Sequence, residues 1–315
     1  MMLSRVAERI YWAARYLQRV ESSARIVNAY TNLLMDLPKE LDISWFNLVT
    51  LNNAQEEYDK RYKIRDERNV VKFILVDDTN TNSMLASLAL VRENFRTTRD
   101  VVPENAWEMI NELSSFAQES INSGGLNRAK RDEFLTQVIN QCQMIQGYVA
   151  STMSHDSIWH MWRIGRAVER ADMTTRLLEA GAGILLNDSM FEQVQAPLIV
   201  WGNVLRSASA DHAYRRAVSS RVRGREVPNF LLFNNQFPRS VNFCLIEIKE
   251  SIKKLPKQRQ LMAGFKDLDG LMSRTQPLTN VEGDLDEKFP DYINKLQLQL
   301  AKLHQSFTDT WFSLD

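Results

Sequence analysis

A charged motif occurs twice in this sequence, and its residue types are those that form buried ion pairs or bind anions. The first copy spans residues 15–25 and the second spans residues 166–176. Alignment of the copies pairs Arg15 with Arg166, Arg19 with Arg170, Glu21 with Asp172, and Arg25 with Arg176. Charges on an otherwise apolar helix are costly to bury unless they are paired. The repeat therefore predicts either a buried ionic layer or an anion-binding site.

Helical spacing predicts specific ion pairs inside each copy. Residues four apart are neighbours on a helix surface, so we expect Glu21 to pair with Arg25 and Asp172 to pair with Arg176. Glu169 shares a helix face with arginines of its own copy. It is the best candidate for an acid or base, since a carboxylate in a crowded site can have a raised pKa. The adjacent arginines would act in the opposite direction and lower that pKa.

A third segment, residues 92–99, has a related pattern in which Arg92, Arg96 and Arg99 lie on one helix face, with Glu93 in the same segment. If the three arginine-bearing faces converge, their acidic residues are too few to neutralise every arginine. The surplus guanidiniums would then bind phosphate or carboxylate groups, whose geometry they match. The alternative is a structural network of ion pairs that ties the helices together.

The composition favours a helical protein with a sizeable core. The chain has 315 residues, of which 44% are hydrophobic, and only 11 are glycine and 8 are proline, so residues that break helices are scarce. The formal net charge is zero, which gives no indication of a nucleic-acid partner or an acidic membrane surface. Cys142 and Cys244 are far apart in the sequence, which indicates neither a metal-binding pair nor a disulfide scaffold and fits a reducing cytoplasm.

Other motifs of catalytic or metal sites are absent from the sequence. It has no Glu-x-x-His pair of the kind that di-iron helical bundles use. His155 and His160 are five residues apart, which places them on different faces of a helix. Neither a Gly-rich phosphate loop nor a Gly-x-Ser-x-Gly elbow is present. We therefore expect no bound metal, no cofactor and no P-loop ATP site.

Hydropathy gives no sign of a membrane segment. Apolar runs such as residues 84–91 and 181–186 are far shorter than the roughly 18–20 residues that span a bilayer. Arg5, Glu8 and Arg9 interrupt the apolar run that a signal peptide would need. The basic stretch at residues 215–225 could hold an acidic partner, but in a neutral protein we interpret it as a solvated junction between helices.

The spacing of apolar residues predicts an all-α fold of about ten helices, forming one domain over residues 1–315. The motif repeat indicates a pseudo-twofold relation between two helical halves. Residues 56–68 are expected to be a charged loop or frayed helix, and Asp156 is expected to cap the helix that carries the second motif copy. Helical segments are expected at about 4–35, 42–53, 70–76, 81–99, 103–121, 128–152, 156–186, 191–206, 211–220, 227–234, 238–254, 256–272 and 285–312.

Several stretches in the same order resemble the bacterial alpha-E family, an all-helical domain named for its Glu-Arg motif, and the resemblance covers essentially the whole chain. These stretches are Tyr11-Trp12 with Arg15-Tyr16, Arg92-Glu93-Asn94, Trp107 with Asn111, Gly165-Arg166 with Glu169-Arg170, and Phe237-Pro238-Arg239-Ser240-Val241. One departure is Gln18, because the family usually has Glu before the arginine of the first copy. Gln keeps hydrogen bonding but not charge, so catalysis by a carboxylate at this position is not expected.

The resemblance implies a role beside an ATP-grasp enzyme. Alpha-E proteins are typically encoded next to, or fused to, an ATP-grasp protein of circularly permuted type, often with a transglutaminase-like peptidase. ATP-grasp enzymes form amide bonds through acyl phosphates. The resemblance therefore implies an accessory, non-catalytic module of an amide-ligase system for peptide synthesis or modification, with the ligase and the peptidase as partners.

There are two alternatives to this hypothesis. The chain could be an enzyme in its own right, acting on a peptide-like substrate with Glu169 as acid or base. It could also be a purely structural helical protein whose motifs form ion pairs that hold helices together. An oligomer is compatible with all three. The residues expected to bind an anion or substrate are Arg15, Arg19, Glu21, Arg25, Arg92, Glu93, Arg96, Arg99, Arg166, Glu169, Arg170, Asp172, Arg176 and Arg239.

Overall fold

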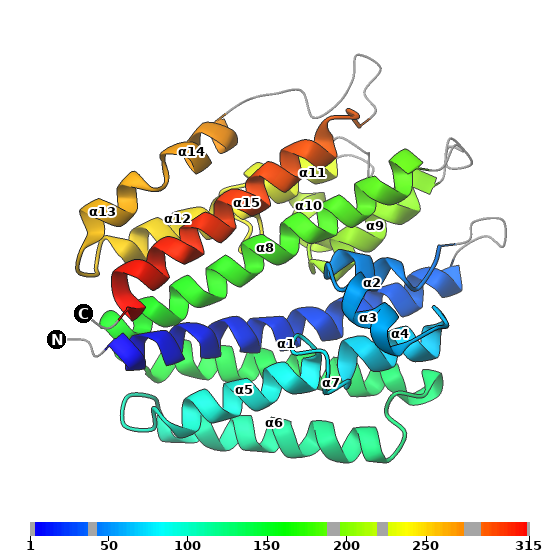
Figure 1. Ribbon diagram of the computed structural model, residues 1–315, viewed down its shortest axis with the longest axis horizontal. Coiled ribbons are helices and arrows are strands. Elements are labelled where there is room, and N and C mark those ends of the chain that lie inside the picture. Colours follow the sequence, from blue (N-terminus) through cyan, green and yellow to red (C-terminus); the bar gives the residue numbers. More distant parts are fainter. Residues whose placement is uncertain (1–3, 37–42, 188–195, 219–225, 274–284, 314–315) are drawn as a thin grey trace.

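The fold is all-α in the part of the chain that the computed structural model describes, which comprises residues 4–36, 43–187, 196–218, 226–273 and 285–313. Every regular element within these ranges is a helix (Figure 1). The predicted fold class is therefore confirmed. The described residues form more helices than the ten or so expected, because several are short and one expected segment is divided.

Two long helices carry the two motif copies and run through the middle of the molecule (Figure 1). They are α1 (Ser4–Asp36) and α8 (Ser157–Asn187). Helices α5 (Met84–Arg96) and α7 (Arg128–Thr152) pack against α1, and α6 (Glu104–Asn122) packs against both of them. Helices α12 (Val241–Ile252) and α15 (Phe289–Phe307) pack against α8. Each motif helix thus has its own set of covering helices.

Shorter helices complete the bundle. They are α2 (Asn47–Leu51), α3 (Gln55–Arg61), α4 (Glu67–Leu75), α9 (Ala196–Ser207), α10 (Asp211–Ala217), α11 (Glu226–Phe233), α13 (Gln258–Ala263), α14 (Lys266–Ser273) and a π-helical turn at Thr308–Phe312. Helix α9 contacts both α1 and α8, and the π-helical turn returns the end of α15 to α1. Buried hydrophobic side chains form one continuous cluster that includes the fully buried Trp162 and Trp201.

The two motif helices cross at a pair of small residues that occupy matching positions in the two copies, Ala14 and Gly165. A Cβ atom added to Gly165 would lie 2.3 Å from the carbonyl oxygen of Tyr11 and 3.2 Å from the Cβ of Ala14. Because only glycine leaves this space, the backbones can approach closely here. The close approach brings the charged residues that follow Ala14 and Gly165 within reach of each other.

Most long helices begin and end close to their expected positions. The side chain of Asp156 accepts hydrogen bonds from the backbone N–H groups of Ile158 and Trp159, at 2.9 and 3.2 Å, and so caps α8 as predicted. The differences concern short segments. Within residues 43–53 of the expected 42–53 helix, residues 47–51 are helical, whereas residue 42 lies outside the described residues. The segment expected as a charged loop or frayed helix at 56–68 includes most of helix α3.

The segment expected as one helix over 256–272 is two helices, because the chain turns between Ala263 and Lys266. Residues 191–195 of the expected 191–206 helix, and residues 219–220 of the expected 211–220 helix, lie outside the described residues. In the described ranges, no helix combines the length and apolar character needed to cross a membrane.

Candidate functional site

The first charged junction joins two arginines of α1 to one carboxylate of α8. Arg15 donates from Nε to Glu169 Oε2 at 2.8 Å. Arg19 donates from Nε to Oε1 at 2.6 Å and from a terminal nitrogen to Oε2 at 3.1 Å. Burial by itself would favour the neutral acid, but the adjacent guanidiniums of Arg19 and Arg15 outweigh it and lower the pKa of Glu169 to about 2. The carboxylate is therefore ionised and occupied on both oxygens.

The second junction surrounds Glu21, which is fully buried on α1. Its Oε1 accepts hydrogen bonds from Arg25 at 2.7 Å and from Arg239, in the loop before α12, at 2.6 Å. Its Oε2 accepts a hydrogen bond from Gln146 of α7 at 3.0 Å. Burial opposes ionisation, but Arg239, Arg25 and Arg170 together lower the pKa of Glu21 to about 2. Three parts of the chain thus meet at one carboxylate.

A third junction links the two copies through neutral groups. Arg170 of α8 donates from Nε to Gln18 Oε1 at 2.7 Å and from Nη2 to Gln146 Oε1 at 3.1 Å. Within the described ranges, no carboxylate forms an ion pair with Arg170. Burial and the neighbouring cations Arg239 and Arg166 lower the pKa of Arg170 to about 9, against the attraction of a nearby carboxylate.

Glu247 of α12 extends this charged region along α8. Arg163 and Arg166 both donate to its Oε1, at 3.2 and 3.3 Å. The Nε atom of Arg166 and the Oε2 atom of Glu247 are buried and have no hydrogen-bond partner among the described residues. Because one atom is a donor and the other an acceptor, this end of the cluster retains unused hydrogen-bonding capacity.

The two ion pairs expected from spacing within each copy are present. Arg25 contacts Glu21 at 2.7 Å, and Arg176 contacts Asp172 at 2.8 Å. The two pairs differ in their surroundings, since the Glu21 side chain is fully buried whereas the Asp172 and Arg176 side chains are each 22% exposed. The aligned pairs are equivalent in spacing but not in burial.

The arginine face of α5 does not join the charged region between α1 and α8. Arg92 is exposed and donates to Asn111 of α6 at 2.7 Å, and Arg96 pairs with Glu93 of its own helix. The guanidinium of Arg99 lies over the ring of Trp107, 4.2 Å from the ring centroid. Helix α5 packs on α1 through apolar side chains instead. Of the three arginine-bearing segments, the structure brings together the two motif helices, which are joined by Arg239.

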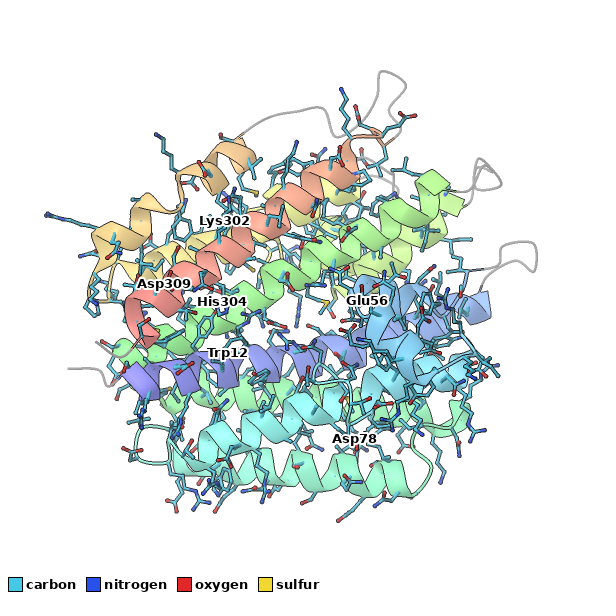
Figure 2. The ribbon with its side chains drawn as sticks, viewed as in Figure 1. Trp12, Glu56, Asp78, Lys302, His304 and Asp309 are labelled. Atoms are coloured by element: carbon cyan, nitrogen blue, oxygen red, sulfur yellow. The ribbon has the colours of Figure 1, made fainter. Side chains whose placement is uncertain are left out.

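An aromatic cluster borders the Glu169 junction. The Tyr11 hydroxyl and Nδ1 of His304 are 2.9 Å apart, and the two rings are stacked. The guanidinium of Arg15 lies 4.9 Å from the ring centroid of Trp12; Figure 2 shows Trp12 and His304 at the place where α15 meets α1. Burial and the positive charge of Arg15 lower the pKa of His304 to about 4, so this imidazole is neutral at pH 7.

Sequence reasoning missed Gln146, Arg163, Glu247 and His304, which belong to α7, α8, α12 and α15. Gln146 carried a signal, because it is a polar residue at a position of α7 whose neighbours one turn away, Cys142 and Val149, are buried. The others are ordinary residues on amphipathic helices and become identifiable only when those helices are placed against α1 and α8.

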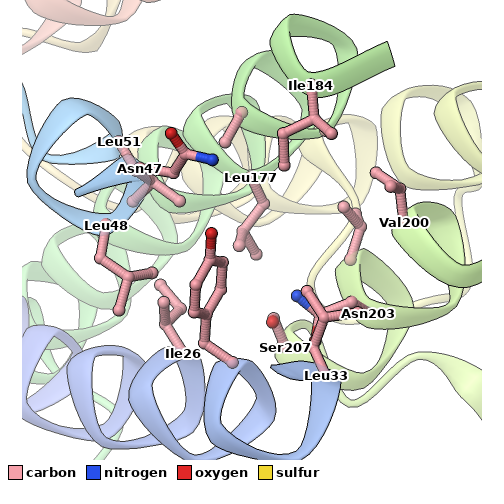
Figure 3. Close-up of a pocket in the computed structure, with 14 residues that line it drawn as sticks. Ile26, Leu33, Asn47, Leu48, Leu51, Leu177, Ile184, Val200, Asn203 and Ser207 are labelled. Carbon is pink, nitrogen blue, oxygen red and sulfur yellow. The ribbon is translucent and has the colours of Figure 1, made fainter. Parts of the chain in front are cut away.

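A separate apolar hollow lies between α1, α2, α8 and α9 (Figure 3). Its cavity volume is about 30 Å³. The lining is mostly aliphatic, and the Oδ1 atom of Asn203 in its wall is buried without a hydrogen-bond partner. None of the charged residues described above lines this hollow.

Metal-ligating residues do not gather in the described part of the chain, where no group of three or more His, Cys, Asp or Glu side chains could hold an ion. Cys142 and Cys244 are both buried and free. Burial raises the pKa of the Cys244 thiol to about 12, although Arg170 acts against this rise. The chemistry of the region is therefore that of guanidinium, carboxylate and amide groups.

Comparison with known proteins identifies relatives with no assigned function. Uncharacterised proteins of Mycobacterium bovis and Mycobacterium tuberculosis are 21% identical to this chain over 324 aligned residues, covering 97% of this chain and 36% of each relative. The chain thus spans about a third of the length of these relatives. No solved structure matches it.

The family comparison agrees with the geometry. The model of the Alpha-E family, described as a predicted alpha-helical domain with a conserved ER motif, matches residues 2–312. In the structure, Glu169-Arg170 and the matching Gln18-Arg19 face each other across the crossing of α1 and α8. This chain therefore belongs to the Alpha-E family.

Proposed function

We propose that this chain is an accessory, non-catalytic module of an ATP-grasp amide-ligase system that synthesises or modifies a peptide. The module docks on a circularly permuted ATP-grasp ligase, with a transglutaminase-like peptidase as a further partner, and holds an anionic group with the arginines of α1 and α8. The two free, buried cysteines fit the reducing cytoplasm in which we place it.

The observation that carries the proposal is an excess of cations in the charged region. Within the described residues, four carboxylates hold the charge-paired arginines of this region, namely Glu21, Glu169, Asp172 and Glu247. The arginines described around them are Arg15, Arg19, Arg25, Arg163, Arg166, Arg170, Arg176 and Arg239. Ion pairing alone does not require such an excess, and the surplus guanidiniums suit an external carboxylate or phosphate.

The coverage of the relatives supports a module. Because the aligned region is 36% of each mycobacterial relative, those proteins join an Alpha-E domain to other sequence of greater length. A domain that is found within longer chains is suited to work beside another activity.

The stand-alone enzyme receives less support from the geometry. A general acid or base at neutral pH needs a pKa near 7 and a free oxygen. The pKa of Glu169 is about 2, and both its oxygens are held by Arg15 and Arg19. Turnover by the purified chain that is lost in Glu169→Gln, with folding intact, would favour this alternative.

The first test is affinity isolation of the tagged protein from its native cells at low salt, followed by mass spectrometry. Recovery of an ATP-grasp ligase supports the proposal and supplies an amide-forming assay. In that assay we expect Arg170→Gln to reduce ligase activity, and the exposed Arg128→Gln to leave it unchanged. Recovery of this chain alone, or unchanged ligase activity of a folded Arg170→Gln variant, contradicts the proposal.

A further inference from the structure

We propose that the anion held by this module is a phosphoryl group and that its binding site is the cluster of Arg166, Arg170 and Arg239, supported by the amides of Gln18 and Gln146. This inference rests on the proposed function for its biological setting, but it concerns a site that the isolated chain possesses. We call these five residues the phosphoryl cluster.

The hydrogen bonds of the phosphoryl cluster fix the guanidinium of Arg170. Gln18 and Gln146 accept one hydrogen bond each from Arg170, at 2.7 and 3.1 Å, and orient its guanidinium plane. Gln146 also donates to Glu21, the carboxylate that holds Arg239. Arg166 lies one turn before Arg170 on the same face of α8. The positive charges of Arg166 and Arg239 therefore both act on Arg170.

The charge balance favours a phosphoryl group over a carboxylate. Among the described residues around Arg170, the pairing carboxylates are Glu21 and Glu247, whereas the arginines are Arg25, Arg163, Arg166, Arg170 and Arg239. A phosphate monoester carries a charge of about −1.5 to −2 at pH 7 and has three acceptor oxygens, so it compensates more of this excess than a single carboxylate does. Three guanidiniums also match the three oxygens in number.

Solvent reaches the edge of the phosphoryl cluster. The side chains of Arg166 and Arg239 are 15% and 14% exposed. Nε of Arg166 is buried and has no partner in the part of the chain that the structure describes, so this arginine has a donor that those residues do not use. An anion entering from this edge would meet charged donors before it meets apolar side chains.

The junction at Glu169 shows what a satisfied arginine pair looks like in the same molecule. There a carboxylate of the protein itself lies between Arg15 and Arg19 and accepts hydrogen bonds on both oxygens. The reciprocal position, opposite Arg170, holds the neutral Gln18 instead. An external anion is therefore directed to Arg170 and not to Arg19, whose counter-ion is already present.

The test is titration of the purified chain with inorganic phosphate at low ionic strength and pH 7.5, followed by calorimetry. We expect saturable binding to the wild-type chain and much weaker binding of acetate. Loss of one charged donor should weaken phosphate binding about tenfold or more in Arg170→Gln. Gln18→Glu, which supplies Arg170 with an internal carboxylate, should weaken binding to a similar extent. Arg128→Gln, an exposed arginine on α7, should bind phosphate like the wild type.

Three results would overturn the inference. They are the absence of saturable phosphate binding, equal binding of acetate and phosphate, and equal weakening in Arg128→Gln and Arg170→Gln. Gln18→Glu keeps the test valid if Arg170→Gln fails to fold, as judged by circular dichroism. The outcome is separable from that of the isolation experiment: a ligase that co-purifies while phosphate does not bind leaves the proposed function standing and removes only the phosphoryl cluster.

Discussion

The two reciprocal junctions between α1 and α8 have similar geometry and different charge. On one side Arg19 reaches across to the carboxylate of Glu169, at 2.6 Å, and on the other Arg170 reaches back to the amide of Gln18, at 2.7 Å. The first junction is an ion pair that is complete within the protein. In the second, no carboxylate of the described residues forms an ion pair with Arg170. The two junctions lie at aligned positions of α1 and α8, and they differ in having a glutamate or a glutamine opposite the arginine. This one difference distinguishes a structural ion pair from a candidate binding site.

The largest effect is expected from Glu169→Gln, which makes the ionic junction resemble the neutral one. It leaves Arg15 and Arg19 partly buried beside an amide, and removal of one partner of a buried ion pair costs about 3–5 kcal/mol. Urea-induced unfolding at pH 7 measures this loss. A loss of stability below about 1 kcal/mol would show that the arginines bind water or other partners instead. The Glu169 ion pairs would then contribute little to holding α1 and α8 together.

A smaller loss is expected from Gly165→Ala, which pushes the two junctions apart at the helix crossing. The added Cβ would lie 2.3 Å from the Tyr11 carbonyl oxygen, a backbone atom that cannot rotate away. Overpacking of this kind costs about 1–3 kcal/mol. Gly183→Ala is the matched control in the same helix, because its Cβ would meet nothing within 4 Å and alanine favours helix by up to about 1 kcal/mol. Equal unfolding midpoints of the two variants would refute the close approach.

Much of this frame could be predicted from the sequence. The pairs Glu21–Arg25 and Asp172–Arg176 could be predicted because both partners lie on one helix, where spacing fixes their distance. The long helices could be predicted because apolar residues recur at helical spacing for many turns. Short segments such as 42–53 were predicted less well, since their ends depend on packing against neighbouring helices and not on local preference.

Contacts between helices could not be read from local patterns. The partners of Glu169 are 154 and 150 residues away in the sequence, and spacing says nothing about the angle at which α1 and α8 cross. The segment 92–99 resembles the motif helices in its arginines, yet Arg92 and Arg99 contact α6 because α5 turns its apolar side toward α1. Similar patterns on two helices therefore do not establish a common site.

Gln18→Glu is expected to increase stability by about 1 kcal/mol, because it gives Arg170 a carboxylate within hydrogen-bonding distance. The gain is limited by repulsion from Glu21, whose Oε2 lies 3.4 Å from Nε2 of Gln18. Chemical unfolding should show a higher midpoint than in the wild type, while Gln118→Glu on the exposed face of α6 should not. A lower midpoint would mean that Glu21, and not the surrounding arginines, dominates the field at residue 18.

The pH dependence of stability should show a contribution from His304. Its pKa is about 4 in the folded protein against 6.5 ordinarily, so the unfolded chain binds more protons between these values. The contribution of His304 to the free energy of unfolding is therefore fully present above about pH 6.5 and is lost as the pH approaches 4. Because the side chain is partly exposed to water, we expect this loss to be about 1 kcal/mol. His304→Gln should remove this slope. Protonation of Glu169 and Glu21, whose pKa values are about 2, lowers the stability only below pH 4.5. This second loss of stability should persist in the His304→Gln variant.

The smallest effect is expected from Asp172→Asn, which breaks the less buried counterpart of the Glu21–Arg25 pair. Both side chains of the Asp172–Arg176 pair are 22% exposed, and pairs four residues apart on a helix contribute about 0.3–0.5 kcal/mol. The loss should shrink in 1 M salt, because salt screens charges that water reaches. Glu21→Gln, the same chemical change at the aligned position, should cost several-fold more and respond little to salt, because its carboxylate holds both Arg25 and Arg239 without contact with solvent. Equal losses of stability at the two positions would mean that burial does not distinguish the two motif copies. The difference between the ion pair at Glu169 and the site at Arg170 would then depend on Gln18 alone.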